Sequence, residues 1–142
     1  MSLSDGVLNE VETLRRLRRH RADRAERALR EAKRAQQTLL AHIRQAEEAL
    51  EHTREEEARQ SAQLLGQHQG QVLDLKALNS WSAEERSLSA NTQRDEGQLL
   101  GLRRQREANE MHVGSAQKQV AECLRQVEKL QELSLLLTQE PT

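Results

Sequence analysis

Apolar residues recur every three or four positions along two long stretches of the chain, and neither stretch contains a proline. Residues at this spacing form one stripe on the surface of a helix, so the pattern predicts two long helices. The first stripe consists of Ala22, Ala25, Leu29, Ala32, Gln36, Leu39, Ile43, Ala46 and Leu50. The second stripe consists of Leu78, Trp81, Leu88, Leu99, Leu102, Val113, Ala116, Val120, Cys123, Val127, Leu130 and Leu137. With one Trp and no Phe or Tyr, the chain has too little bulk for a wide globular core.

The segment between the two stripes is the expected turn. Gly66 and Gly70 lie there, each costs about 1 kcal/mol in a helix interior relative to Ala, and Gly is the residue that most easily ends a helix. The start of the second helix is open between residues 71 and 79. Ser82 and Glu85 have the spacing of a capping box, whereas Leu78 already follows the later heptad.

These observations predict an all-α fold in which two long helices form an antiparallel coiled-coil hairpin. The hairpin is expected to make up a single elongated domain over residues 1–142. Its parts are expected to be a first helix over about 7–66, a turn over about 66–78 and a second helix over about 79–138. Polar residues interrupt the second stripe, so its middle should be the looser part. They are Glu85, Thr92, Asp95, Arg106 and Asn109.

The register of the hairpin follows from matching the two stripes. If paired residues have numbers that sum to 145, apolar residues of one helix lie opposite apolar residues of the other. The resulting pairs are Ile43 with Leu102, Ala46 with Leu99, Ala25 with Val120, Leu64 with Trp81, and Gln36 with Asn109. A sum of 138 is the alternative, although it places Ile43 against Asp95.

Residues suited to catalysis or to metal binding are few. The chain has one cysteine, so it has no internal disulfide, and Cys123 falls on the second stripe, where we interpret it as a small apolar core residue. The five histidines lack the spacing of a metal site, and no Gly-rich phosphate loop is visible. We therefore expect no enzymatic activity, no cofactor and no metal. The first residues lack the basic start and apolar core of a signal peptide, which favours a cytoplasmic protein without membrane insertion.

One strongly basic stretch stands out in a chain whose net charge is only -1. Residues 15–34 contain ten basic and three acidic residues, an excess of +7. The basic residues are Arg15, Arg16, Arg18, Arg19, Arg21, Arg24, Arg27, Arg30, Lys33 and Arg34. Further along, the same predicted helix becomes acidic through Glu47, Glu48, Glu51, Glu55, Glu56 and Glu57. Like charges crowded on a helix destabilise it unless a partner offsets them, so we interpret the basic stretch as an interaction surface and not only a solvated helix.

The partner of this surface is either nucleic acid or an acidic protein surface. Clusters of Lys and Arg bind phosphates by releasing counterions. Against nucleic acid, no aromatic residue lies near the cluster to stack on a base. An acidic groove or ring of subunits is the favoured partner. A nucleic-acid binder and a generic structural coiled-coil scaffold remain as alternatives.

The basic stretch resembles the N-terminal helix of the YscO/FliJ family, the small stalk proteins of type III secretion and flagellar export. The likeness rests on the Leu/Arg-rich opening LRRLRRHRADRAERALREAKRAQQ, from Leu14 to Gln37, and on the element from Arg24 to Ala28 within it. The segment LNSWSAEERSL, from Leu78 to Leu88, resembles the Leu-x-x-Trp-x6-Leu segment of the injectisome branch. One departure is that residues 1–13 precede the basic stretch, whereas we expect relatives to begin close to it.

The resemblance implies a non-enzymatic central stalk of a type III secretion apparatus, located in the cytoplasm at the inner-membrane machinery. It implies that the basic helical end, with the end of the second helix around residues 120–137, binds the hexameric secretion ATPase. It also implies a link to the cytoplasmic domain of the export gate and contacts with chaperones of translocator proteins. Trp81 has two interpretations: it packs near Leu64 and fixes the register, or it is exposed and docks on a partner such as the export gate.

Overall fold

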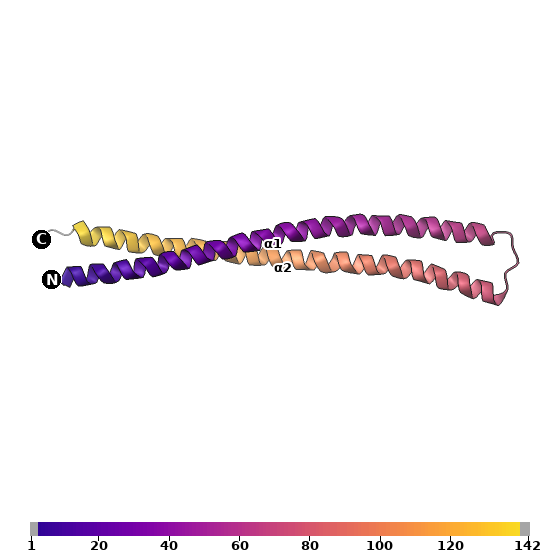
Figure 1. Cartoon of the computed structure of the whole chain (residues 1–142), viewed down its shortest axis with the longest axis horizontal. Coiled ribbons are helices and arrows are strands. Elements are labelled where there is room, and N and C mark those ends of the chain that lie inside the picture. Colours follow the sequence, from indigo (N-terminus) through magenta and orange to yellow (C-terminus); the bar gives the residue numbers. More distant parts are fainter. Residues whose placement is uncertain (1–2, 140–142) are drawn as a thin grey trace. The chain divides into compact units, whose positions relative to one another are not determined.

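The computed structural model describes residues 3–139, and the side chains of residues 5–139, as two long helices joined by a turn. Helix α1 spans Leu3–His68 and helix α2 spans Leu75–Gln139 (Figure 1). Within this described range there is no strand. The predicted all-α hairpin of two long antiparallel helices is confirmed.

Contacts group the chain into two compact units, each formed by a length of α1 packed antiparallel on a length of α2. Among the described residues, the terminal unit comprises 3–37 and 108–139, and the turn unit comprises 38–107. Because each unit has only two helices, its core is the single seam between them.

Small side chains form the core of the terminal unit. Ala22 is almost fully buried against Cys123 and Val127, with Ala25 packed beside them. The burial of Cys123 confirms its interpretation as a core residue. The stretch before the basic residues is part of this unit, because α1 starts at Leu3 and not near residue 7, and Val11 is buried. Residues 1 and 2 of that expected leader lie outside the described residues.

Larger side chains form the core of the turn unit. Ile43, Leu50 and Leu99 make one buried cluster, and Ala46 and Leu102 pack against it. The register in which numbers sum to 145 pairs Ile43 with Leu102 and Ala46 with Leu99, and all four residues belong to this cluster. In the terminal unit the same sum pairs Ala22 with Cys123, which also share a cluster.

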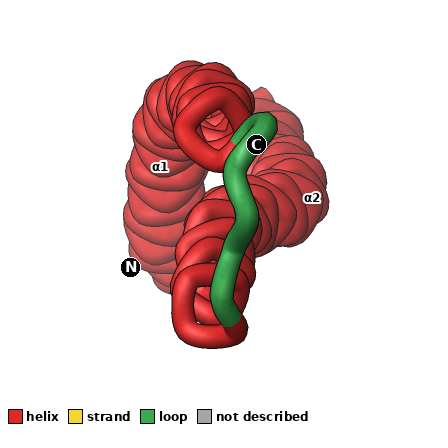
Figure 2. The backbone as a smooth tube through the Cα atoms, turned by 90° about the vertical axis from the view of Figure 1, so that its right-hand side faces the viewer, coloured by secondary structure: helices red, strands yellow, loops and turns green. Residues whose placement is uncertain are grey.

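The turn is shorter than the expected span of residues 66–78. A short loop joins the two helices (Figure 2). Gly66 remains inside α1, and Gly70 in the loop has a φ of 75°, the left-handed conformation that Gly adopts without strain. The amide of Gln71 then donates to the carbonyl of His68 at 3.2 Å. Helix α2 begins at Leu75 because Asp74 caps it: the Ala77 amide donates to Asp74 Oδ1 at 2.7 Å.

The interpretation of Ser82 and Glu85 as a capping box is therefore wrong. Ser82 lies inside α2, more than one turn after its first residue. Glu85 instead accepts hydrogen bonds from the side chains of Ser61 and Trp81. The carboxylate of Glu85 therefore connects the two helices and does not cap the start of α2.

Two adjacent leucines test the seam of the turn unit. Leu99 is 5% exposed and Leu100 is 50% exposed. We expect Leu99→Ala to lower the free energy of unfolding by about 2–4 kcal/mol, because it removes a buried side chain and leaves a cavity. Leu100→Ala should change it by less than about 0.5 kcal/mol. Urea unfolding followed by helical circular dichroism measures both, and equal losses would contradict the seam described here.

Candidate functional site

The basic segment, residues 15–34, lies within α1 of the terminal unit. Eight of its ten basic side chains are exposed, and Arg15 and Arg18 are half-buried. The exposed ones are Arg16, Arg19, Arg21, Arg24, Arg27, Arg30, Lys33 and Arg34. A dense positive surface therefore faces the solvent.

Arg15 and Arg18 contribute to the fold as well as to the charge. Arg15 Nη1 lies 3.0 Å from Glu12 Oε1. Arg18 Nη1 donates to the carbonyl of Gln126 at 3.4 Å, which joins α1 to α2. The sequence pattern treated all ten basic residues alike, and these contacts separate two of them from the exposed eight.

Exposed leucines accompany the basic segment. Leu14 and Leu17 are exposed on α1, and Leu133, Leu135 and Leu136 are exposed near the end of α2 in the same unit. All five residues lie off the two apolar stripes, so the stripe pattern did not identify them. Exposing leucine side chains to water costs free energy. A partner that covers these leucines would therefore be stabilised by apolar contact as well as by charge.

Trp81 lies at the base of the turn and is half-buried. Its ring stacks on the ring of His68, with centroids 4.9 Å apart and planes at 26°. Its Nε1 donates to Glu85 Oε1 at 3.2 Å. His68 is half-buried in this stack. Trp81 thus fastens the two helices where they leave the turn.

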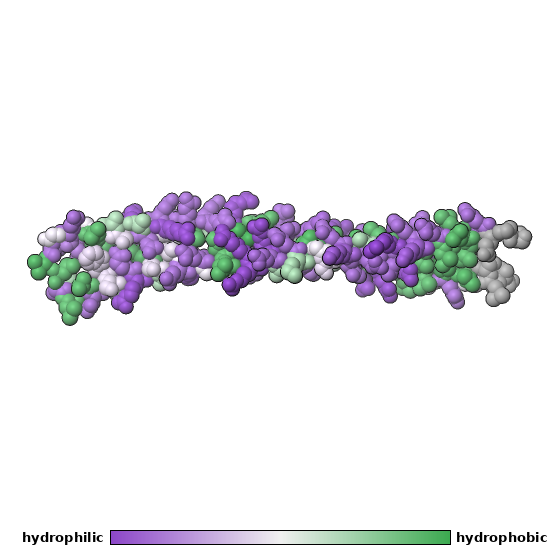
Figure 3. Space-filling view, turned by 180° about the vertical axis from the view of Figure 1, so that it is seen from behind, coloured by the Kyte–Doolittle hydropathy of each residue, from purple (hydrophilic) through white to green (hydrophobic). Residues whose placement is uncertain are grey.

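Four apolar side chains stand exposed around the turn and form the turn apolar cluster: Leu65, Val72, Leu75 and Leu78. Val72 is fully exposed and Leu75 is 74% exposed. Apolar side chains gather at this end of the turn unit in Figure 3. Residues 60–73 contain no Asp, Glu, Lys or Arg, and residues 74–78 hold one Asp and one Lys, so the sequence around the cluster has no net charge. The turn unit therefore presents an apolar contact surface.

The seam of the turn unit becomes polar towards the turn. None of the residues from 51 to 91 is buried. The helices are joined there by hydroxyl groups that donate to carboxylates: Thr53 to Asp95 at 2.6 Å, Ser61 to Glu85 at 2.9 Å, and Thr92 to Glu57. Hydrogen bonds to charged groups contribute about 1.5–3 kcal/mol each, so polar contacts in this half of the unit take the place of the apolar burial around Leu99.

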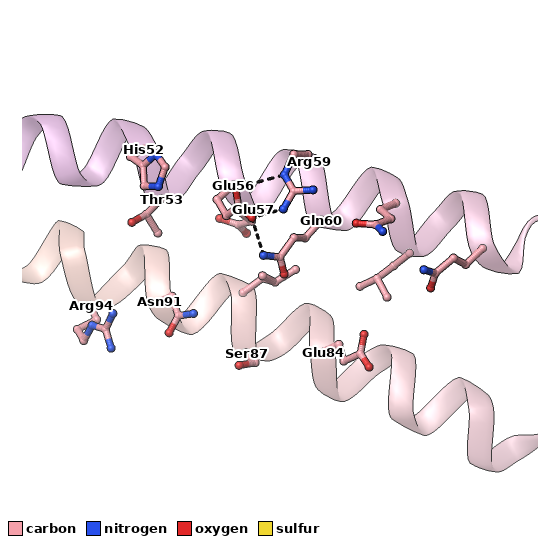
Figure 4. A pocket seen from close by; sticks show the side chains of 14 residues that line it. His52, Thr53, Glu56, Glu57, Arg59, Gln60, Glu84, Ser87, Asn91 and Arg94 are labelled. Atoms are coloured by element: carbon pink, nitrogen blue, oxygen red, sulfur yellow. Dashed lines mark hydrogen bonds and ion pairs between the residues drawn. The ribbon is translucent and has the colours of Figure 1, made fainter.

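A groove of about 710 Å³ runs along this polar seam. Its α1 wall extends from His52 to Gln67, and its α2 wall extends from Glu84 to Arg94. Figure 4 shows the two helices diverging towards the turn, with side chains of both walls directed into the space between them. Leu64 and Leu88 supply its apolar lining, and the rest is polar or charged.

Glu56 carries a permanent negative charge on the α1 wall. Both its oxygens are bonded by Arg59, and Gln60 Nε2 donates to Oε1 at 2.8 Å. These hydrogen bonds lower the pKa of Glu56 from 4.5 to about 2. The carboxylate is thus ionised at any physiological pH.

No grouping of three or more His, Cys, Asp or Glu side chains suited to a metal ion occurs among residues 5–139. Over the same part of the chain, neither helix is long and apolar enough to cross a membrane. The chemistry that the surfaces provide is ionic and apolar contact.

Comparison with known proteins gives one match. Residues 11–141 match the family described as type III secretion protein YscO. No curated protein and no solved structure matches the chain. The family match covers the basic segment, the groove and the turn apolar cluster.

The His68–Trp81 stack predicts a change in fluorescence. We expect His68→Ala to increase the quenching of Trp81 by acrylamide, because the substitution uncovers one face of the indole ring. Gln67→Ala is the matched control, since Gln67 is the exposed neighbour of His68. Equal quenching constants for the two variants would show that the stack does not cover Trp81.

The low pKa of Glu56 should depend on its hydrogen bonds from Arg59. The lowered pKa means that Glu56 stabilises the folded state above pH 4.5 and that this contribution is lost as the pH falls through about 2. Because the pair is exposed, the contribution is small. We expect Arg59→Ala to raise the pKa of Glu56 towards 4.5, as measured by NMR titration of its side-chain carboxyl carbon. An unchanged titration would exclude Arg59 as the main cause.

Proposed function

Since the chain belongs to the YscO family of type III secretion proteins, we propose that it is a non-enzymatic central-stalk component of the export apparatus. In this proposal the basic segment binds acidic surfaces of the hexameric secretion ATPase. The turn unit links the ATPase to the cytoplasmic domain of the export gate, and secretion chaperones bind the same chain. The protein acts in the cytoplasm, at the periphery of the inner-membrane machinery.

The exposure of the basic segment is the observation that carries the proposal. Eight basic side chains face solvent within residues 15–34, and the same 20 residues hold only three acids, so the segment keeps an excess of +7. Exposed charges of one sign attract an oppositely charged surface from a distance and raise the rate of association. The nearby leucines, Leu14 and Leu17, add apolar contact once the partner is bound.

The ten basic residues have two roles in this proposal. The eight exposed ones contact the partner directly. Arg15 and Arg18 position the segment, since Arg15 pairs with Glu12 and Arg18 holds α1 to the carbonyl of Gln126. The end of α2 accompanies them through the exposed leucines at 133, 135 and 136.

The turn apolar cluster is the proposed contact for the export gate. Its four side chains are exposed and uncharged, so they favour an apolar cleft over a charged surface. Trp81 belongs to this contact as a residue that fixes the geometry of the turn through its stack on His68. Trp81 is only partly buried, so a partner could contact its exposed part.

Charge reversal in the basic segment tests the ATPase contact. We expect Arg21→Glu, Arg24→Glu and Arg27→Glu together to weaken binding to the purified cognate ATPase at low salt by ~10-fold or more, because three attractive contacts become repulsive. Binding of the parent chain should weaken as salt rises, since exposed charges are screened beyond about 8 Å at physiological ionic strength. Sedimentation or surface plasmon resonance measures the affinity, and secretion by the complemented mutant measures function.

The matched control reverses three exposed basic residues of the turn unit, Arg44, Lys76 and Arg104. It changes the net charge by the same amount and should leave ATPase binding nearly unchanged. Circular dichroism should show equal helicity for both triple variants. Equal affinities of the two variants for the ATPase would contradict a role of the basic segment.

A further inference from the structure

A second stripe of side chains runs along α1 beside the core stripe, within the terminal unit. Its members follow one another at steps of three and four residues, so they share one flank of the helix. They form the lateral stripe: Leu14, Leu17, Arg21, Arg24 and Ala28. All five side chains are exposed, and Leu14 and Leu17 are 45% and 54% exposed. A single row of this kind extends over about 21 Å, which is the form of surface that one further helix covers when it packs alongside.

The acidic residues of this part of α1 lie on another flank. Between residues 11 and 30 the acids are Glu12, Asp23 and Glu26. Each lies two positions from a residue of the lateral stripe, a rotation of about 200° around the helix. Glu12 and Glu26 are half-buried, and Glu12 accepts hydrogen bonds from Arg15 at 3.0 Å and from Ser134 of α2 at 3.4 Å. The fold therefore uses the acidic flank, whereas the lateral stripe is open and carries no acid.

Arg21 and Arg24 leave the positive charge of this stripe unbalanced. Within residues 5–139 neither side chain makes an ion pair or a hydrogen bond. Their spacing of three residues makes them neighbours on the helix surface, where like charges repel each other. An acidic side chain placed between them by a partner relieves that repulsion and forms new ion pairs.

The ends of the lateral stripe distinguish between kinds of acidic partner. Glu10 and Glu31 continue the same three-and-four spacing beyond Leu14 and Ala28, and both carboxylates are exposed. A membrane or a long nucleic acid laid along this flank reaches these carboxylates and is repelled by them. A short helix avoids them if it places apolar residues against the leucines and acids against Arg21 and Arg24. The pattern of charge therefore favours a helix of limited length.

We propose that the lateral stripe binds an acidic amphipathic helix of a partner protein, which packs alongside α1 as a third helix of the terminal unit. Leu14 and Leu17 are covered by apolar side chains of that helix, and Arg21 and Arg24 pair with its carboxylates. The inference rests on the proposed function, because it names the face of the basic segment and the kind of element that binds there. The other exposed basic residues add attraction over longer distances.

A designed helical peptide tests this inference without the ATPase. The probe is a fluorescein-labelled, alanine-rich peptide with two Leu and two Glu in one stripe at steps of three and four residues. Two versions, with either the leucines or the glutamates first, sample both orientations. Fluorescence anisotropy at 150 mM NaCl should show that the full-length chain binds at least one version. We expect Arg21→Glu with Arg24→Glu to weaken this binding by ~10-fold or more, because attraction becomes repulsion.

Two further variants complete the test. Leu14→Gln with Leu17→Gln should weaken binding of the peptide by ~5-fold or more, because apolar contact is lost. The matched control is Arg16→Glu with Arg19→Glu, which makes the same change of charge at exposed residues on another flank of the basic segment. It should weaken binding by less than ~3-fold, because it alters only the longer-range attraction. Circular dichroism should show equal helicity for all three variants.

Three results would overturn the inference. They are a parent chain that binds neither peptide, equal weakening by the two arginine pairs, and tight binding to vesicles of equal parts phosphatidylcholine and phosphatidylserine that Arg21→Glu with Arg24→Glu abolishes. The last result would assign the stripe to a membrane. A chain that binds the peptide through the lateral stripe but does not bind the ATPase would refute the proposed function alone. A chain that binds the ATPase but neither peptide would refute the lateral stripe alone.

Discussion

Burial of a single stripe of side chains between two helices is the interaction on which the rest of this structure depends. In the terminal unit the stripe is made of small residues such as Ala22, and in the turn unit it is made of Ile43, Leu50 and Leu99. A seam of this kind covers only one side of each helix. Most side chains therefore face water, and the sequence of the outer faces is free to encode charge. The basic segment and the acidic run of residues 47–57 are consequences of an architecture that has almost no interior.

The helices, the two stripes and the pairing of Ile43 with Leu102 could be predicted because periodicity and register depend on spacing alone. The ends of the helices were less predictable. Gly66 and Gly70 look equivalent in the sequence, yet Gly66 stays helical and Gly70 takes the left-handed conformation. The cost of one Gly in a helix is about 1 kcal/mol, which continued pairing of the helices offsets. The cap from Asp74 then decides where α2 begins, a choice made by one local hydrogen bond.

The candidate surfaces also combine features that the sequence predicts with features that it does not. The basic segment follows from composition, whereas the use of Arg18 by the fold depends on a carbonyl of Gln126, far away in sequence. Asn109 was expected beside Gln36, and its Nδ2 donates instead to the carbonyl of Ala32 at 3.4 Å. The stack of His68 on Trp81 and the groove are each formed by residues of both helices. Contacts of this kind depend on side-chain rotamers after the register is set, and spacing does not determine rotamers.

The near-zero net charge of the chain has a physical consequence for how its surfaces work. Seen from far away, the excess of +7 in residues 15–34 and the excess of -5 in residues 47–57 largely cancel with the rest, so a net charge of -1 attracts little. Within about 8 Å the screening is incomplete and each patch acts with its own sign. Counterion release from phosphates is also a local effect of the contacting Lys and Arg residues, so it too depends on the basic segment and not on the net charge. An acidic surface that reaches the basic segment at close range therefore experiences the local charge of +7 and not the net charge of -1.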